Sequence, residues 1–267
     1  MAEILASSPP ADWRPIAPEN TLYLDLPGGR RVIIELAGGF APNHVANIER
    51  LVRQGYFDGL AIVREQDNYV VQWADPDETR SVGAAKKTLK AEFSHPFDAA
   101  TAFTQLPDVD TYAPETGFTD GFPVARDPAS GQTWLTHCYG MVGAGRDNDA
   151  DSGGGTELYA VIGNAPRQLD RNVTLVGRVL RGMEWLSSLP RGTGELGFYQ
   201  TPAERTPIVS MKVAADLPAA QRVPLQALRT DSATFAALLR NRRFREDAWY
   251  KTPAGHIDVC NMPLPVR

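Results

Sequence analysis

The chain has 267 residues, of which 43% are hydrophobic and 22% charged, enough apolar side chains for one large domain or two small ones. Its net charge of −5 gives no electrostatic basis for binding nucleic acid. No apolar run approaches the roughly 20 residues that a transmembrane helix needs, so the sequence predicts no membrane span.

The first 18 residues are rich in proline and lack the basic start and apolar stretch of a signal peptide. They are expected to form a poorly ordered leader. Cys138 and Cys260 lie far apart and are expected either to form one disulfide in an oxidising compartment or to remain buried thiols. The leader and the cysteine pair favour an exported, periplasmic protein whose signal has been removed, with a cytoplasmic location as the alternative.

A β-hairpin and a helix are predicted first along the chain. Residues 21–26 and 31–36 alternate around a Pro-Gly-Gly turn, which is typical of a hairpin. Pro42 suits the first turn of a helix and Gly55 suits its end, and apolar residues recur at helical spacing between them.

Two short β-rich runs follow, at residues 60–63 and 69–73, separated by a polar turn. This pattern predicts neighbouring antiparallel strands. Arg64 stands at the end of the first run. The run around Arg64 is interpreted either as an arginine held beside an apolar cup or as a half-buried hairpin with an exposed arginine.

Alternation along the second run is expected to sort its side chains onto two faces of the sheet. One face would carry Tyr69, Val71 and Trp73, and the other would carry Val70 and Gln72.

The remainder of the chain predicts further strands and few helices. Residues 89–93 are expected to form a strand, and residues 94–134, rich in Pro, Asp, Thr and Gly, an irregular insertion. The later predicted elements are strands at 139–143, 157–162, 173–180 and 208–214, and helices at 183–189 and near 231–245. Many strands joined by glycine-rich turns predict a closed antiparallel β-barrel.

The last predicted helix lies in an extension that begins at residue 217, and its final turn is rich in arginine. These arginines are interpreted as a solvated turn that complements the helix dipole, with a phosphate or carboxylate site as the alternative. A disulfide between Cys138 and Cys260 would tie this extension to the barrel.

Several polar motifs are weighed as candidate sites. Residues 147–153 carry acids at alternate positions like a calcium loop, but the glycine is one residue late and Glu157 stands one position early. A solvated acidic loop is therefore favoured. His137 and the cysteine after it would point to opposite faces of a strand, which argues against a shared metal ion. His44 and His95 are expected at the surface.

The order of these elements carries a series of short motifs. They are YFDG at 56–59, Arg64, Tyr69-Val70-Val71-Gln72, AEF at 91–93, GMV at 140–142 and LDRNVTLVGRV at 169–179. In this order the motifs resemble those of bacterial-type cyclophilins, a family of peptidyl-prolyl cis-trans isomerases. The resemblance covers residues 20–215 and leaves the later residues unaccounted for.

The resemblance implies a mainly β fold: a closed, eight-stranded antiparallel barrel capped by two helices. Residues 1–18 would be the leader, 19–216 the barrel with an insertion at about 94–137, and 217–267 the extension. The implied catalytic residue is Arg64. The implied substrate-binding residues are Tyr69, Val70, Gln72, Gly145, Arg146, Glu157, Tyr159 and Leu169.

The chain also departs from the family pattern. Ile62-Val63 stands where the family has phenylalanine and histidine, and Val173 stands where it has histidine. Glu157 replaces a glutamine, and residues 145–147 replace an Ala-Asn-Ala stretch. These departures predict slower turnover and an altered sequence preference.

The chemistry of such a site requires neither a nucleophile nor a metal, so no cofactor is expected. The barrier to rotation about a peptide bond is about 18–20 kcal/mol. A cation that hydrogen-bonds the prolyl nitrogen weakens its conjugation with the carbonyl, and Arg64 offers a charged fork of donors. We therefore predict a monomeric isomerase that acts on proline-containing peptides or unfolded proteins. The alternatives are a chaperone or docking module that grips proline-containing segments with little turnover, and a β-barrel that binds something unrelated to proline.

Overall fold

The computed structural model describes residues 1–98 and 100–267, and the chain divides into two compact units. The larger unit consists of Ala17–Ser94 and His137–Val223. The smaller unit consists of Met1–Ile16, His95–Thr136 and Pro224–Arg267. Segments that the sequence separates into leader, insertion and extension therefore contribute to one unit. No helix in the described chain combines the length and apolarity that crossing a bilayer requires.

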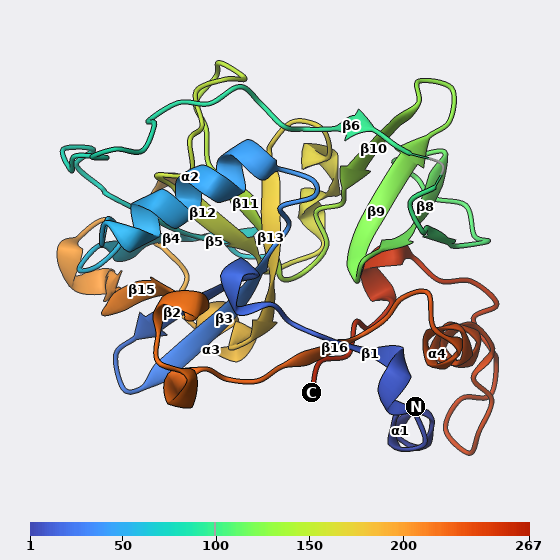
Figure 1. The fold of residues 1–267 in the computed structure, drawn as a ribbon. Coiled ribbons are helices and arrows are strands. Elements are labelled where there is room, and N and C mark those ends of the chain that lie inside the picture. Colours follow the sequence, from blue (N-terminus) through green and yellow to red (C-terminus); the bar gives the residue numbers. More distant parts are fainter. Residues whose placement is uncertain (99) are drawn as a thin grey trace. The chain divides into compact units, whose positions relative to one another are not determined.

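The larger unit is built on one antiparallel sheet of nine strands (Figure 1). Their order is β14-β4-β5-β12-β11-β13-β3-β2-β15. In chain order the strands are β2 (Thr21–Leu26), β3 (Arg30–Leu36), β4 (Ala61–Glu65), β5 (Val70–Ala74), β11 (Met141–Ala144), β12 (Leu158–Val161), β13 (Leu175–Arg181), β14 (Thr206–Pro207) and β15 (Ser210–Val213). The predicted hairpin at 21–36 is confirmed, with Leu24 opposite Val32.

The count of nine corrects the eight strands that the resemblance implied. Residues 206–213 form two short strands because Ile208 and Val209 separate β14 from β15. The two strands pair with different partners, β14 with β4 and β15 with β2. The strand expected at 208–214 is observed as β15, and β14 is an additional strand at the opposite end of the strand order.

Helix α2 (Pro42–Arg53) covers the sheet with one apolar face (Figure 1). Val45, Ile48 and Leu51 recur at helical spacing, and Ile48 and Leu51 are fully buried in the same core cluster as the strand residue Trp73. A second helix, α3 (Met183–Ser187), lies next to β3. The two helices predicted for this part of the chain are confirmed.

Two expectations about residues 89–93 and His44 are wrong. Residues 89–93 do not form a strand. Instead the Glu92 carboxylate accepts hydrogen bonds from the backbone N–H groups of Asn43 and His44 at the start of α2. His44 was expected at the surface but is buried. Its ring faces Glu92, with Nδ1 2.7 Å from Glu92 Oε2. These bonds satisfy donors that a helix leaves open at its first turn.

The smaller unit contains regular structure where an irregular insertion was expected. Its strands are β1 (Trp13–Pro15), β6 (His95–Pro96), β7 (Thr104–Gln105), β8 (Glu115–Thr119), β9 (Phe122–Asp127), β10 (Gln132–Leu135) and β16 (Gln226–Leu228). Five of them form a sheet in the order β6-β10-β9-β8-β7. Asp120 and Gly121, both with positive φ, make the two-residue turn between β8 and β9. Asp-Gly is a strong hairpin signal, and the composition of the surrounding segment concealed it.

The amino-terminal residues also differ from the poorly ordered leader that was expected. They form helix α1 (Ala2–Ala6) and strand β1, which pairs antiparallel with β16. Trp13 is buried and stacks with the Arg267 guanidinium, which explains why this strand is held in place. The helix expected near 231–245 is confirmed as α4 (Ala233–Phe244), with Phe235 buried on its inner face.

Candidate functional site

A pocket of about 490 Å³ lies on the larger unit, on the side of the sheet that carries Arg64. Its lining includes every residue predicted for catalysis or substrate binding: Arg64, Tyr69, Val70, Gln72, Gly145, Arg146, Glu157, Tyr159 and Leu169. Asp147, Asn148 and Val173 complete the lining. The structure thus brings together residues that are up to 109 positions apart in sequence, from Arg64 to Val173.

Neighbouring strands place the central side chains of this pocket. Arg64 on β4 is in register with Gln72 on β5, and Gln72 is in register with Tyr159 on β12. A register shift between Ile62 and Arg64 marks a β-bulge, which re-aims the side chain that follows it. The three polar side chains therefore stand side by side across adjacent strands.

One prediction about the faces of β5 is wrong. Tyr69 lines the pocket together with Val70 and Gln72, whereas it was expected to share a face with Val71 and Trp73. Tyr69 precedes β5 and lies in a turn, where its own backbone N–H donates to the Gln66 carbonyl. Strand alternation therefore does not determine which way its side chain points. Val71 and Trp73 are in the core, as their alternation predicts.

Hydrogen bonds hold the Arg64 guanidinium in one orientation. Its Nε donates to the Leu196 carbonyl at 2.7 Å, and its Nη1 donates to Gln72 Oε1 at 3.1 Å. Its Nη2 donates to Gln66 Oε1. The guanidinium also lies 5.4 Å from the centre of the Tyr69 ring and 5.1 Å from that of Phe198.

Arg64 stays protonated although it is partly buried. Desolvation lowers the pKa of Arg64, while Tyr69 and Glu157 act in the opposite direction. An arginine starts from so high a pKa that it stays protonated in proteins. Of its five N–H donors three are used in the described contacts, which leaves two directed at neither Gln66, Gln72 nor Leu196.

A buried polar chain fixes Tyr159, the second aromatic of the pocket. Its hydroxyl donates to His137 Nε2 at 2.8 Å, because the His137 Nδ1–H faces Asp170 Oδ1 at 3.0 Å. Asp170 Oδ2 in turn accepts from Arg167 Nε at 2.8 Å. Burial raises the pKa of Tyr159 well above its ordinary value, so the hydroxyl remains a donor. Gly143 lies opposite Tyr159, and a Cβ there would come within 2.3 Å of the ring.

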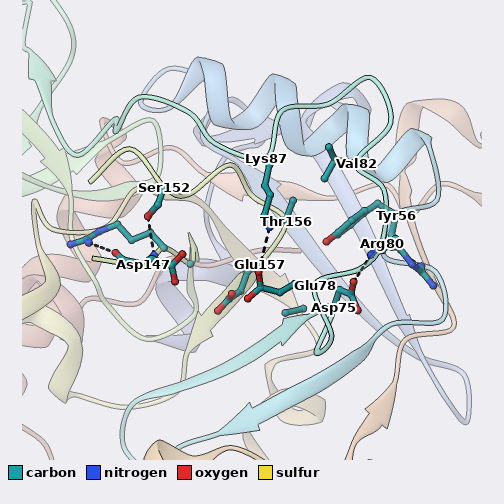
Figure 2. Close-up of a pocket in the computed structure, with 13 residues that line it drawn as sticks. Tyr56, Asp75, Glu78, Arg80, Val82, Lys87, Asp147, Ser152, Thr156 and Glu157 are labelled. Atoms are coloured by element: carbon teal, nitrogen blue, oxygen red, sulfur yellow. Dashed lines mark hydrogen bonds and ion pairs between the residues drawn. The ribbon is translucent and has the colours of Figure 1, made fainter. Parts of the chain in front are cut away.

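Glu157 lines both this pocket and a smaller pocket of about 80 Å³, whose lining residues Figure 2 shows. Burial, followed by the charges of Asp147 and Glu78, raises the pKa of Glu157, and the charge of Arg64 acts against this rise. A Cβ at Gly145 would lie 2.8 Å from Glu157 Cγ, so this position leaves room only for glycine. None of the described Arg64 hydrogen bonds goes to Glu157.

The carboxylates of the acidic loop bond to backbone N–H groups. Asp149 accepts from the backbone of Asp151, and Asp151 accepts from the backbone of Ala91, so these carboxylates hold the loop itself. Within residues 1–98 and 100–267 there is no group of three or more side chains that could hold a metal ion. Both Cys138 and Cys260 are disulfide-bonded, and neither is a free thiol.

Sequence reasoning missed the residues that orient the catalytic candidates. Gln66 follows Arg64 by two positions, a spacing that places both side chains on one face of a strand and could have identified it. Leu196 acts through its backbone carbonyl, which leaves no trace in the type of side chain. His137 was considered only as a metal ligand, and nothing in its sequence neighbourhood indicates the contact with Tyr159.

Comparisons with known proteins test the family resemblance and the fold. A family model described as cyclophilin type peptidyl-prolyl cis-trans isomerase/CLD matches residues 23–213. A probable peptidyl-prolyl cis-trans isomerase from Brucella suis is 27% identical over 203 residues, which cover 74% of this chain and 85% of the relative. Peptidyl-prolyl cis-trans isomerase B from Bacillus subtilis is 26% identical over 173 residues, 65% of this chain and 92% of the relative.

The crystal structure of cyclophilin AquaCyp293 from Hirschia baltica is similar over 100% of this chain and 96% of its own, with a TM-score of 0.78 and 27% sequence identity. The family resemblance stated from the motifs is confirmed. Since the family model spans most of the chain, including every residue that lines the Arg64 pocket, this protein belongs to the cyclophilin-type peptidyl-prolyl cis-trans isomerases.

Proposed function

We propose that this isomerase rotates X–Pro bonds by gripping the proline ring in the pocket while Arg64 faces the prolyl nitrogen. One observation carries the proposal: an arginine with two uncommitted N–H groups lines the same pocket as Tyr69, Val70 and Tyr159. A pocket of about 490 Å³ is wide enough for the ring and its flanking peptide groups.

Rotation needs electrostatic help but no covalent step. In the planar peptide the nitrogen lone pair is delocalised into the carbonyl, and this conjugation is lost as the bond twists. The lone pair then becomes a hydrogen-bond acceptor for the Arg64 guanidinium. Because this bond forms only in the twisted state, it lowers the barrier without tightening the ground state.

The other pocket residues receive supporting roles. Tyr69, Val70, Tyr159 and Leu169 would contact the ring, and Gln72, whose oxygen faces Arg64, would donate its amide N–H to a peptide carbonyl. Gly145 and Arg146 would contact the extended peptide backbone, and Glu157 would accept from a peptide N–H. The Glu157 carboxylate replaces the family's glutamine, which alters the preference for residues near proline.

Replacing the catalytic cation tests the proposal. Arg64→Ala should lower the isomerisation rate about 10²–10³-fold, the usual loss when one preorganised donor to the transition state is removed. Arg64→Lys keeps the charge but loses the planar fork, so it should recover only part of the rate. A protease-coupled assay on a proline peptide measures this, with a thermal melt to check the fold. Equal rates for wild type and Arg64→Ala would refute the mechanism and would favour a peptide-gripping module.

We also propose that the protein works as a monomer on unfolded chains in an oxidising compartment such as the periplasm. The disulfide-bonded state of Cys138 and Cys260 supports this location, because structural disulfides persist where thiols are not kept reduced. Counting reactive thiols in denatured protein taken directly from its native cells tests the location. Two reactive thiols would contradict it.

A further inference from the structure

The segment of residues 190–199, which follows α3, lies along the edge of β4 and is here called the arginine-facing segment. Its backbone is bonded to β4 at two points: the Tyr199 N–H donates to the Val63 carbonyl, and the Gly192 N–H donates to the Glu65 carbonyl, both at 2.9 Å. Phe198 additionally forms an antiparallel bridge with Arg64. The segment therefore covers an edge that would otherwise expose unpaired backbone groups next to Arg64.

The same segment contacts the Arg64 guanidinium directly. The Leu196 carbonyl accepts from Arg64 Nε at 2.7 Å, and the Phe198 ring centre lies 5.1 Å from the guanidinium carbon. Leu196 has φ of 54°, uncommon for a residue with a side chain. That side chain is 59% exposed, so the carbonyl is its contribution to the site. Gly197 approaches β4 so closely that a Cβ there would lie 2.7 Å from Gln66 Cα.

Arg191 anchors the start of the segment to a buried carboxyl beside Arg64. Its Nη1 donates to Glu65 Oε1 at 2.7 Å, and its Nε donates to Asp67 Oδ1 at 2.9 Å. Glu65 is fully buried, and its other oxygen has no hydrogen-bond partner in the described structure. The hydrogen bond between Arg191 and the Glu65 carboxyl holds a fixed geometry, because the buried carboxyl cannot replace the guanidinium with water as its partner.

We propose that Arg191 is a positioning residue for the isomerase reaction: by binding Glu65, it holds the arginine-facing segment so that the Leu196 carbonyl and the Phe198 ring keep Arg64 aimed into the pocket. The inference rests on the proposed role of Arg64. Arg191 lines neither the pocket of Arg64 nor its smaller neighbour, so its effect reaches the substrate only through the segment.

The test separates the rate of rotation from the affinity for peptide. Arg191→Met keeps the length of the side chain and removes its charge, and Arg191→Lys restores the charge. Arg50→Met, on an exposed residue of α2, is the matched control for the loss of one surface cation. Exchange NMR on a saturating proline peptide gives the isomerisation rate in the bound state, and a titration of the same peptide gives its Kd.

Arg191→Met is expected to slow bound-state isomerisation roughly 10- to 100-fold, the scale of a small misplacement of a catalytic group. The Kd should stay unchanged, because Tyr69, Val70 and Tyr159 still form the pocket. Arg191→Lys should recover most of the rate, and Arg50→Met should match wild type. In an Arg64→Ala background, Arg191→Met should cause no further loss, since it acts through the missing guanidinium.

A wild-type bound-state rate for folded Arg191→Met, or an equal loss with and without Arg64, would overturn the inference. If Arg191→Met melts below the assay temperature, Gly197→Ala tests the same step, because its Cβ pushes the Leu196 carbonyl away from β4. A wild-type rate in that variant would also overturn it. Wild-type protein that fails to accelerate exchange at all would refute the isomerase mechanism itself, which is a distinguishable result.

Discussion

Buried Glu65 should make the stability of this protein fall as the pH rises through neutrality. Burial raises the pKa of Glu65 from its ordinary value of 4.5 to about 8, although Arg191 acts in the opposite direction, and Asp67 adds to the rise. The folded state therefore holds this proton more tightly than the unfolded chain does. Its contribution to stability is complete below pH 4.5 and is lost as the pH rises to about 8.

The size of the effect follows from the two pKa values. At 1.36 kcal/mol for each pKa unit, the difference between them corresponds to about 5 kcal/mol. This is comparable with the whole unfolding free energy of many domains, which is about 5–15 kcal/mol. Solvent screening does little to reduce this order of magnitude, because the Glu65 side chain is not exposed to solvent.

Glu65→Gln isolates this contribution, because glutamine keeps an oxygen for Arg191 but does not titrate. Urea unfolding of both proteins between pH 4 and pH 9 gives two curves of unfolding free energy against pH. The wild-type curve should fall relative to the Glu65→Gln curve by about 1.4 kcal/mol per pH unit inside the window. Parallel curves would show that Glu65 titrates at its ordinary pKa, and the argument from its burial would be refuted.

Two further predictions concern groups outside the catalytic step. His137→Ala leaves the buried Tyr159 hydroxyl without its acceptor and should lower the unfolding free energy by about 1–3 kcal/mol in urea titrations. Adding Tyr159→Phe to this variant should restore part of the lost stability. An unchanged unfolding midpoint in His137→Ala would contradict the buried hydrogen bond. Peptide mapping of unreduced protein should recover Cys138 and Cys260 in one cross-linked fragment, and separate linear fragments would exclude that pairing.

Local signals in the chain predicted most elements of the larger unit. The hairpin at 21–36 and helix α2 follow from alternation, from the proline at 42 and from a stripe of apolar residues, and all of these act between neighbours in sequence. The failures were also local. Residues 94–134 were treated as irregular on composition, although the Asp120-Gly121 pair indicated a hairpin.

The pocket was predictable for a different reason. Its residues come from short motifs on strands that pair with one another, so a motif resemblance predicts their neighbourhood as well as their identity. Tyr69 shows the limit of pattern reasoning. It lies one residue before β5, in the turn, so the alternation that assigns faces along the strand does not extend to it.

Arg64, the residues that line its pocket and the isomerase family could be stated from the sequence alone, because side-chain types in a fixed order carry that information. Only the tertiary structure showed which distant groups contact Arg64 and its neighbour Glu65. The Leu196 carbonyl is 132 residues away from Arg64, and Arg191 reaches Glu65 across 126 residues. Any residue can supply a backbone carbonyl, and nothing in the sequence around Glu65 distinguishes this buried carboxyl from an exposed one.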